Sequence, residues 1–415
     1  MMRLATWKFH AISWVAAFAL GVILGVPRSA WGQTSEAFKY TGVGSCSASN
    51  CHGTTQPPQK AGDPDNTYTI WVSKDKHSKA YESLSKKDSI KIAKNLGIAK
   101  AESDKKCLTC HALDLKKEQL APKAKYDIGD GNQCEQCHGP AEKWLEGHDK
   151  SKEWPHEKSV KLGMYDTQNV LLRAEKCISC HLAIDHEMVA AGHPDLTFEL
   201  DTFSAPSKEF QPHWKDKGTW FGPKAWGTGQ AVALRDALQQ LAKRASANVP
   251  DKVVADSWRQ AQGYYGVMRH AASQISPDGL KALDQEISAL AGLMSKPGEN
   301  RSKIAASATQ AAKAAEKLAP QISGKEFNQQ LTLAVMKNIA GDSDRISAAG
   351  FRAAEQTALG LDRLYLAYAR AVKPADAKAV KASIGKLFDA LPEDPAKYDP
   401  KAFAAEMQKV QASLK

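Results

Sequence analysis

Eight cysteines occur in this chain of 415 residues, and all of them belong to close pairs that are followed at once by histidine. The four pairs are Cys46/Cys51, Cys107/Cys110, Cys134/Cys137 and Cys177/Cys180, and the histidines are His52, His111, His138 and His181. Cys-x-x-Cys-His is the attachment signature of c-type haem. Both thiols bind the porphyrin covalently, and the histidine is the proximal ligand of the iron. The pattern therefore predicts four covalently attached haem c groups.

Paired cysteines also occur in disulfides and in zinc knuckles. Neither of these requires a histidine after every pair, so haem attachment is favoured at all four positions. The first motif has four residues between Cys46 and Cys51 instead of two. A short bulged loop can still bring both of these sulfurs to the porphyrin edge. This assignment uses all eight cysteines and leaves none for a disulfide.

The other face of each iron needs a second ligand, and histidines are abundant around the motifs. Besides the proximal ones, residues 33–415 contain His77, His148, His156, His186, His193, His213 and His270. Among the motifs the only methionines are Met164 and Met188. Because histidines far outnumber methionines there, we expect bis-histidine ligation. Methionine ligation raises the reduction potential, so the scarcity of methionine implies low-potential haems.

The spare histidines differ in their surroundings. We predict that His77, His148, His193 and His186 are distal iron ligands, with His213 as a weaker candidate and His156 and His270 in ordinary surface or structural roles. Gly192 and Pro194 flank His193, and these residues let the backbone approach a flat ring closely.

Residues 1–32 have the pattern of an export signal. Arg3 and Lys8 precede the apolar run 11–26, and small residues stand at the cleavage positions before Gln33. We predict a signal peptide over residues 1–32 and a periplasmic or otherwise exported mature chain. The alternative is that this segment is retained as a membrane anchor, and only then is contact with a membrane expected.

The remaining sequence predicts a mainly α fold in two parts. Composition is that of a soluble globular protein, and the net charge of +10 is too diffuse to indicate nucleic-acid binding. Residues 33–225 have few aliphatic runs, so we expect a tetrahaem domain of short helices and long loops in which the porphyrins supply the core. Residues 226–415 have helical periodicity, which predicts an antiparallel helical bundle. Its expected helices are 228–245, 254–273, 277–295, 303–318, 324–339, 343–372, 375–390 and 400–414.

Residues from about 40 to 235 resemble the tetrahaem cytochrome c-554 family of exported multihaem cytochromes. The resemblance rests on the four haem motifs, Val43–Cys46, Trp71 with His77, Pro140 with Trp144 and His148, Ala190–Pro194, Pro212–Trp214 and Gly229–Leu234. It implies covalent haem c, electron transfer, haems stacked in pairs and mostly bis-histidine ligation. It also implies that one haem can lack a distal ligand and bind a small molecule such as nitric oxide. Similar sequences have a further haem motif near residues 245–258, but this chain has no cysteine there.

Three functions are compatible with these features. The first is an electron carrier between redox partner proteins such as other cytochromes or oxidoreductases, and the four attachment sites with spare histidines favour it. The second is a haem enzyme with one open iron that acts on a small nitrogen oxide, hydroxylamine or peroxide. The third is an assembly role, in which residues 226–415 recruit the cytochrome into a larger complex.

Overall fold

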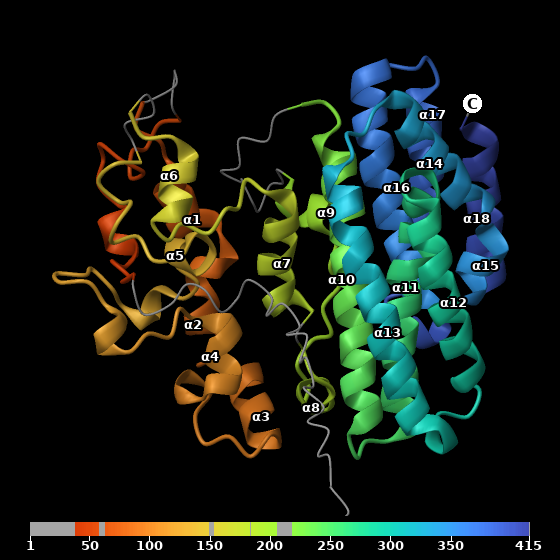
Figure 1. Ribbon diagram of the computed structural model, residues 1–415, viewed down its shortest axis with the longest axis horizontal. Coiled ribbons are helices and arrows are strands. Elements are labelled where there is room, and N and C mark those ends of the chain that lie inside the picture. Colours follow the sequence, from red (N-terminus) through yellow and green to blue (C-terminus); the bar gives the residue numbers. More distant parts are fainter. Residues whose placement is uncertain (1–37, 58–62, 149–152, 183, 206–217, 415) are drawn as a thin grey trace, which may run out of the picture.

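The computed structural model describes residues 38–57, 63–148, 153–182, 184–205 and 218–414 (Figure 1). The expected signal peptide and His213 lie outside the described residues. Within the described ranges no strand is formed, and one isolated bridge joins Tyr40 to Leu120. The predicted mainly α class is confirmed. None of the described helices is long and apolar enough to cross a membrane.

The haem motifs lie in a region of short helices, which we call the motif region (residues 38–205). Its helices are α1 (Thr67–Lys74), α2 (Ala80–Ser83), α3 (Lys87–Asn95), α4 (Lys105–His111), α5 (Cys134–His138), α6 (His156–Lys161), α7 (Val170–His181), α8 (His186–Ala190) and α9 (Leu200–Ser204). Short 3-10 turns lie between some of them, including Val43–Ser45 and Lys76–Lys79. Around α2 to α4 the apolar core is small, with Leu84, Leu108 and three alanines buried. So small an apolar core stabilises a domain weakly by itself, and a bound group that is apolar would add to it.

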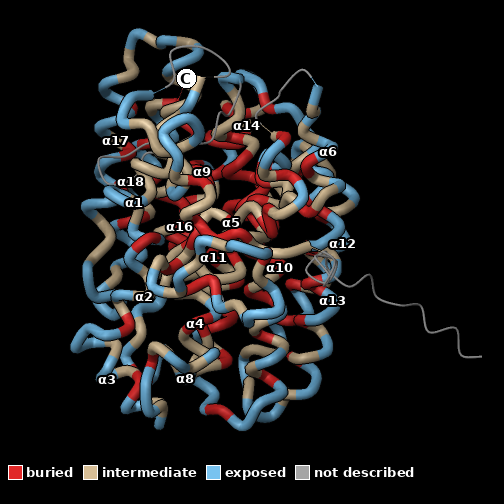
Figure 2. Tube along the Cα trace, turned by 90° about the vertical axis from the view of Figure 1, so that its left-hand side faces the viewer, coloured by how far each residue is buried: buried red, intermediate tan, exposed pale blue. Residues whose placement is uncertain are grey.

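The rest of the described chain consists mostly of longer helices that stand side by side (Figure 1). They are α10 (Phe221–Ser246), α11 (Asp251–Ile275), α12 (Pro277–Leu293), α13 (Pro297–Gly324), α14 (Gln329–Gly341), α15 (Ser343–Ala348), α16 (Phe351–Val372), α17 (Ala377–Asp389) and α18 (Pro400–Ser413). We call these nine the C-terminal helices. Their apolar faces form two large buried clusters, and Figure 2 shows buried positions gathered around α10, α11 and α16.

Most of the expected helices differ from those observed only by some residues at their ends, and two differ more. The expected helix 343–372 is divided into α15 and α16, because Gly350 has a φ of 101°, which is left-handed backbone that favours glycine. The expected helix 303–318 is the middle of the longer α13, which continues through Pro320. Proline removes one helical hydrogen bond, but Leu318, Ala319 and Ile322 are buried there, so packing holds the helix together.

Helix α10 connects the two parts of the structure. It contacts α11 and α13 among the C-terminal helices, and α7 and α9 in the motif region. At Gly229 of α10, an added Cβ atom would lie 2.6 Å from the Cβ atom of Leu200, so only glycine permits this approach of α9. The boundary expected between residues 225 and 226 falls inside α10, and the division into domains 33–225 and 226–415 stays a prediction.

Candidate functional site

Three of the four motifs occupy the last turn of a helix. Helices α4, α5 and α7 end at His111, His138 and His181, respectively. Residues three apart on a helix share a face, so both cysteines of each motif project to one side. In the first motif Cys46 ends a 3-10 turn, and a tight turn brings the amide of Cys51 to 2.9 Å from the carbonyl of Ala48. All eight cysteines are free thiols, as covalent haem attachment requires. We number the motifs 1 to 4 in chain order.

Three proximal histidines lie opposite three of the predicted distal ligands. The ring centroids are 5.9 Å apart for His52 and His148, 6.0 Å for His77 and His181, and 6.3 Å for His111 and His193. Bonds between a metal and an imidazole nitrogen are about 2 Å long, so two imidazoles on opposite sides of one iron have centroids about 6 Å apart. The three separations therefore match the space that an iron between two histidines needs.

In five of these six histidines, Nδ1 is bonded to an oxygen atom. The partners are Asp65 for His52 (2.8 Å), Asp75 for His77 (2.9 Å), the Ala80 carbonyl for His111 (3.0 Å), the Leu145 carbonyl for His148 (2.7 Å) and the Pro194 carbonyl for His193 (2.9 Å). Histidine that binds a metal typically donates its second ring N–H in this way. The hydrogen bond places the proton on Nδ1 and leaves the Nε2 lone pair for the iron.

The surroundings also shift the pKa values of these rings. Burial lowers the pKa of His181 to about 4, with a contribution from the charge of His77. Burial likewise lowers the pKa of His111, and the charge of His193 acts in the same direction. In His77 the hydrogen bond to Asp75 raises the pKa. Because the neutral imidazole is the form that binds a metal, the low pKa values keep His181 and His111 ready for ligation at neutral pH.

His186 does not lie in such a pair within the described residues. It is the first residue of α8, whose preceding residue Asp185 caps the helix by accepting from the amide of Met188 (2.8 Å). The ammonium group of Lys106 on α4 lies 3.0 Å from Asp185 and 2.7 Å from Glu187. This places α8 beside motif 2, where His193 already faces His111. The role of His186 as an iron ligand stays a prediction.

The remaining described histidines have carboxylate partners. Nε2 of His156 lies 2.9 Å from Asp166, and Nε2 of the buried His270 lies 3.0 Å from Asp342 within the C-terminal helices. Both arrangements fit the structural roles expected for them. Within the described ranges, no three or more Cys, His, Asp or Glu side chains converge as a metal-ion site.

Contacts between cysteines bring different motifs together. The thiols of Cys46 and Cys134 lie close enough to shift each other's pKa, and the same is true of Cys110 and Cys180. The Sγ atom of Cys180 also lies 3.9 Å from the carbonyl oxygen of Thr109 in motif 2. Cys177 is partly buried; the loss of solvent around its thiol raises the pKa to about 12, and the charge of Cys137 adds to this shift. Motif 3 therefore lies next to motifs 1 and 4, and motif 4 lies next to motif 2.

A buried carboxylate that no sequence pattern predicts holds motifs 1 and 3 together. Glu135 is 2 % exposed and accepts hydrogen bonds from the amides of Thr41 (3.0 Å), Gly42 (2.7 Å) and Ala141 (2.7 Å). Next to it, the Gln133 side chain accepts from the amide of Val43 at 3.0 Å. The partners lie far apart in the chain, and no local pattern signals the contact. Asp75, by contrast, could have been found from its position two residues before His77.

Comparison with family models gives a match for the middle of the motif region. Residues 45–139 match the family described as cytochrome c554 and c-prime. This segment is similar to cytochrome c554, and we call it the c554-type segment. The c554-type segment includes motifs 1 to 3 and His77, and over this range it confirms the resemblance found in the sequence. Motif 4, His148, His193 and the C-terminal helices lie beyond it. Neither the curated proteins nor the solved structures include a match to the chain.

Proposed function

We propose that this chain is an exported tetrahaem c-type cytochrome that carries single electrons between redox partner proteins. The similarity of the c554-type segment to the cytochrome c554 family supports covalent haem c and electron transfer. The observation that carries the proposal is the set of three facing histidine pairs, each joining a motif histidine to a histidine from elsewhere in the chain. Haem iron, when bound, supplies one-electron chemistry by changing between its ferric and ferrous states.

The proposed axial ligands follow from these pairs. His52 and His148 would hold the iron of motif 1, His111 and His193 that of motif 2, and His181 and His77 that of motif 4. For motif 3 we propose His138 with another histidine. Two imidazoles stabilise the ferric state more than a histidine and a methionine do, so low potentials are proposed for these sites.

The cysteine contacts support an order for the four sites. Glu135 of motif 3 binds the segment before Cys46, the thiols of Cys137 and Cys177 lie near each other, and Cys180 Sγ lies 3.9 Å from the carbonyl oxygen of Thr109 in motif 2. The attachment points therefore follow one another as motifs 1, 3, 4 and 2. Neighbouring attachment points bring neighbouring porphyrins close, so we propose that sites 1 and 2 are the two ends at which redox partners exchange electrons.

Intact-mass spectrometry of the protein from a haem-maturing host tests the haem content. We expect the mass of a chain that begins at Gln33 plus four haems. The double variant C107A/C110A is expected to have three haems, and the control H156A is expected to keep four, because His156 pairs with Asp166. A protein with the mass of the polypeptide alone would contradict the proposal.

Electron paramagnetic resonance separates the carrier from the haem enzyme. For a carrier we expect four low-spin ferric signals and no change when nitric oxide is added. A high-spin signal that disappears with nitric oxide would support an open iron, and with it the alternative enzyme acting on a small nitrogen oxide, hydroxylamine or peroxide.

A further inference from the structure

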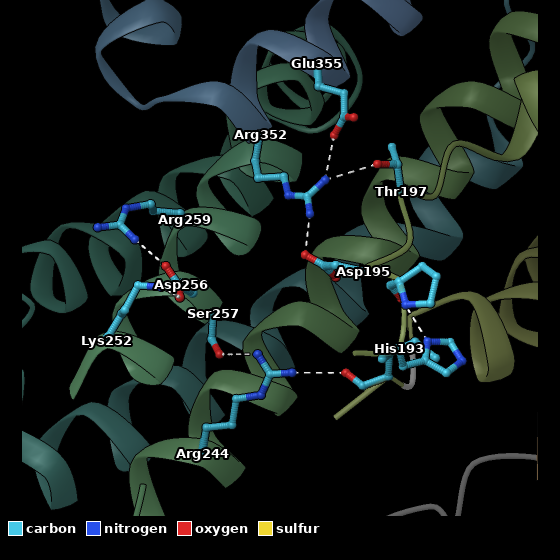
Figure 3. Close-up of polar contacts among 12 residues, drawn as sticks. His193, Asp195, Thr197, Arg244, Lys252, Asp256, Ser257, Arg259, Arg352 and Glu355 are labelled. Atoms are coloured by element: carbon cyan, nitrogen blue, oxygen red, sulfur yellow. Dashed lines mark hydrogen bonds and ion pairs between the residues drawn. The ribbon is translucent and has the colours of Figure 1, made fainter. Parts of the chain in front are cut away.

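The segment that carries His193 lies against the C-terminal helices, and hydrogen bonds hold both of its ends. Before His193, Gln240 of α10 donates to the carbonyl of Leu182. Arg244 of α10 donates to the carbonyl of Ile184 at 3.0 Å, and its other terminal nitrogen donates to Ser257 of α11 at 2.7 Å (Figure 3). The start of the segment is thus attached to two of the C-terminal helices.

After His193, the main attachment is Arg352, near the start of α16 (Figure 3). Its guanidinium group donates to the carboxylate of Asp195, to the hydroxyl of Thr197 at 3.1 Å and to Glu355 of α16 at 2.9 Å. A planar guanidinium group with three partners has one orientation. Glu355 therefore fixes the arginine on its own helix, and the arginine fixes Asp195 and Thr197.

The same face of α16 continues this contact. Gln356, one turn after Arg352, donates to the carbonyl of Phe198 at 3.1 Å and accepts from Gln230 of α10 at 2.8 Å. Farther along α16, Arg363 donates to Asp201 at 2.6 Å. Residues 195–201 are therefore held by side chains of α16 between Arg352 and Arg363.

The contact with Asp195 reaches the imidazole of His193 through one peptide group. Nδ1 of His193 is 2.9 Å from the carbonyl oxygen of Pro194, and this carbonyl belongs to the peptide bond that joins Pro194 to Asp195. Proline restricts the backbone here, so fixing Asp195 also fixes the direction of that carbonyl. The carbonyl in turn sets the orientation of the ring and leaves Nε2 for the iron.

We infer that Arg352 is a positioning residue for His193, and that the C-terminal helices brace the distal ligand of the haem at motif 2. The inference rests on the proposed function, in which His193 lies opposite His111 on one iron. It gives the C-terminal helices a role within the cytochrome itself: they hold one iron ligand in place.

Carbon monoxide binding to the reduced, haem-loaded full-length protein tests this inference. Carbon monoxide binds a ferrous haem when the distal ligand leaves, so its stoichiometry counts opened sites. In R352A we expect the fraction of the motif 2 haem that binds carbon monoxide to rise about tenfold over the wild type, as for the loss of a charge-assisted hydrogen bond. In R352K we expect this fraction to lie between those of the wild type and R352A, because lysine pairs with Asp195 but cannot also hold Thr197 and Glu355. D195N is expected to resemble R352A.

Two further variants make the result decisive. H193A removes the ligand and is expected to bind one more carbon monoxide per molecule than the wild type. The control R259A removes an arginine of α11 that pairs with Asp256, and it is expected to behave as the wild type (Figure 3). Haem content and thermal unfolding, measured for every variant, show which of them remain folded.

The possible results distinguish the inference from the proposed function. If H193A opens no site, His193 is not a ligand, and the proposed assignment at motif 2 fails. If H193A opens one site while folded R352A and D195N both match the wild type, the assignment stands and the inference about Arg352 is wrong. If R352A does not fold, D195N decides in the same way, because it keeps the arginine and removes one charge at the exposed end of the contact.

Discussion

His77 and His181 face each other with ring centroids 6.0 Å apart and ring planes at 81°. His181 ends α7, whereas His77 lies in the 3-10 turn Lys76–Lys79. Asp75 caps that turn through the amide of His77 at 2.9 Å and also bonds Nδ1 of its ring at 2.9 Å. One carboxylate thus sets both the backbone and the ring of the proposed ligand, which makes this pair the best constrained for a test by mutation.

Replacement of His77 by methionine is expected to raise the reduction potential of one haem. Methionine stabilises the ferrous state relative to histidine, so one of the four midpoint potentials shifts upward while the other three stay in place. Optical redox titration measures this change. H156A serves as the control with four unchanged potentials, and an unchanged titration of H77M would show that His77 is not a ligand.

The D65N variant is expected to raise the potential of the haem at motif 1. Although burial opposes it, the hydrogen bonds from His52 and Thr67 hold the pKa of the Asp65 carboxyl well below its usual range, so Asp65 is ionised beside His52. An ionised partner increases the basicity of the imidazole and stabilises the ferric iron. A tenfold change in the relative affinity for the two oxidation states is about 59 mV for one electron, and we expect a shift of this order. The control D88N changes an exposed carboxylate on α3. Equal potentials in D65N and D88N would contradict the prediction.

Loss of the Glu135 side chain is expected to destabilise the motif region. In E135A the buried amides of Thr41, Gly42 and Ala141 lose their acceptor, at a cost of about 3 kcal/mol or more. Chemical denaturation measures the free energy of unfolding, and E135Q should recover part of the loss because its amide oxygen still accepts. The control E146A removes an exposed carboxylate nearby and should leave the stability unchanged. Similar unfolding curves for E135A and E146A would argue against this role.

Glu199 is expected to make the stability depend on pH. Full burial, together with the charge of Asp201, raises its pKa to about 7 from an ordinary value of 4.5. Because the folded chain then binds more protons than the unfolded chain, the free energy of unfolding falls as the pH rises from about 4.5 to about 7, by up to about 3 kcal/mol. E199Q should remove this part of the pH dependence, and E118Q, which changes an exposed glutamate, should keep it. Parallel pH profiles for E199Q and the wild type would refute the prediction.

Local sequence was sufficient for the features that depend on near neighbours. Cysteines three apart with a following histidine define a haem motif wherever the chain places them, and the structure puts three of these motifs on single helical turns. The apolar periodicity beyond residue 225 predicted the positions of the C-terminal helices, because a helix buries one face at a fixed spacing. It did not predict the division at Gly350, where the left-handed backbone depends on how α15 and α16 pack.

The pairing of the histidines and the contacts of Arg352 and Glu135 depend on packing between distant segments. Nothing near His193 in the sequence indicates that it meets His111, or that Arg352 holds the residue after Pro194. The buried Glu135 likewise acquires its partners only when the segment before motif 1 folds onto motif 3. Ligand pairing and bracing require side chains from separate elements to meet within a few ångströms, and that distance is a property of the folded chain. Covalent attachment needs only the order of neighbouring residues, and for this reason it could be predicted from the sequence alone.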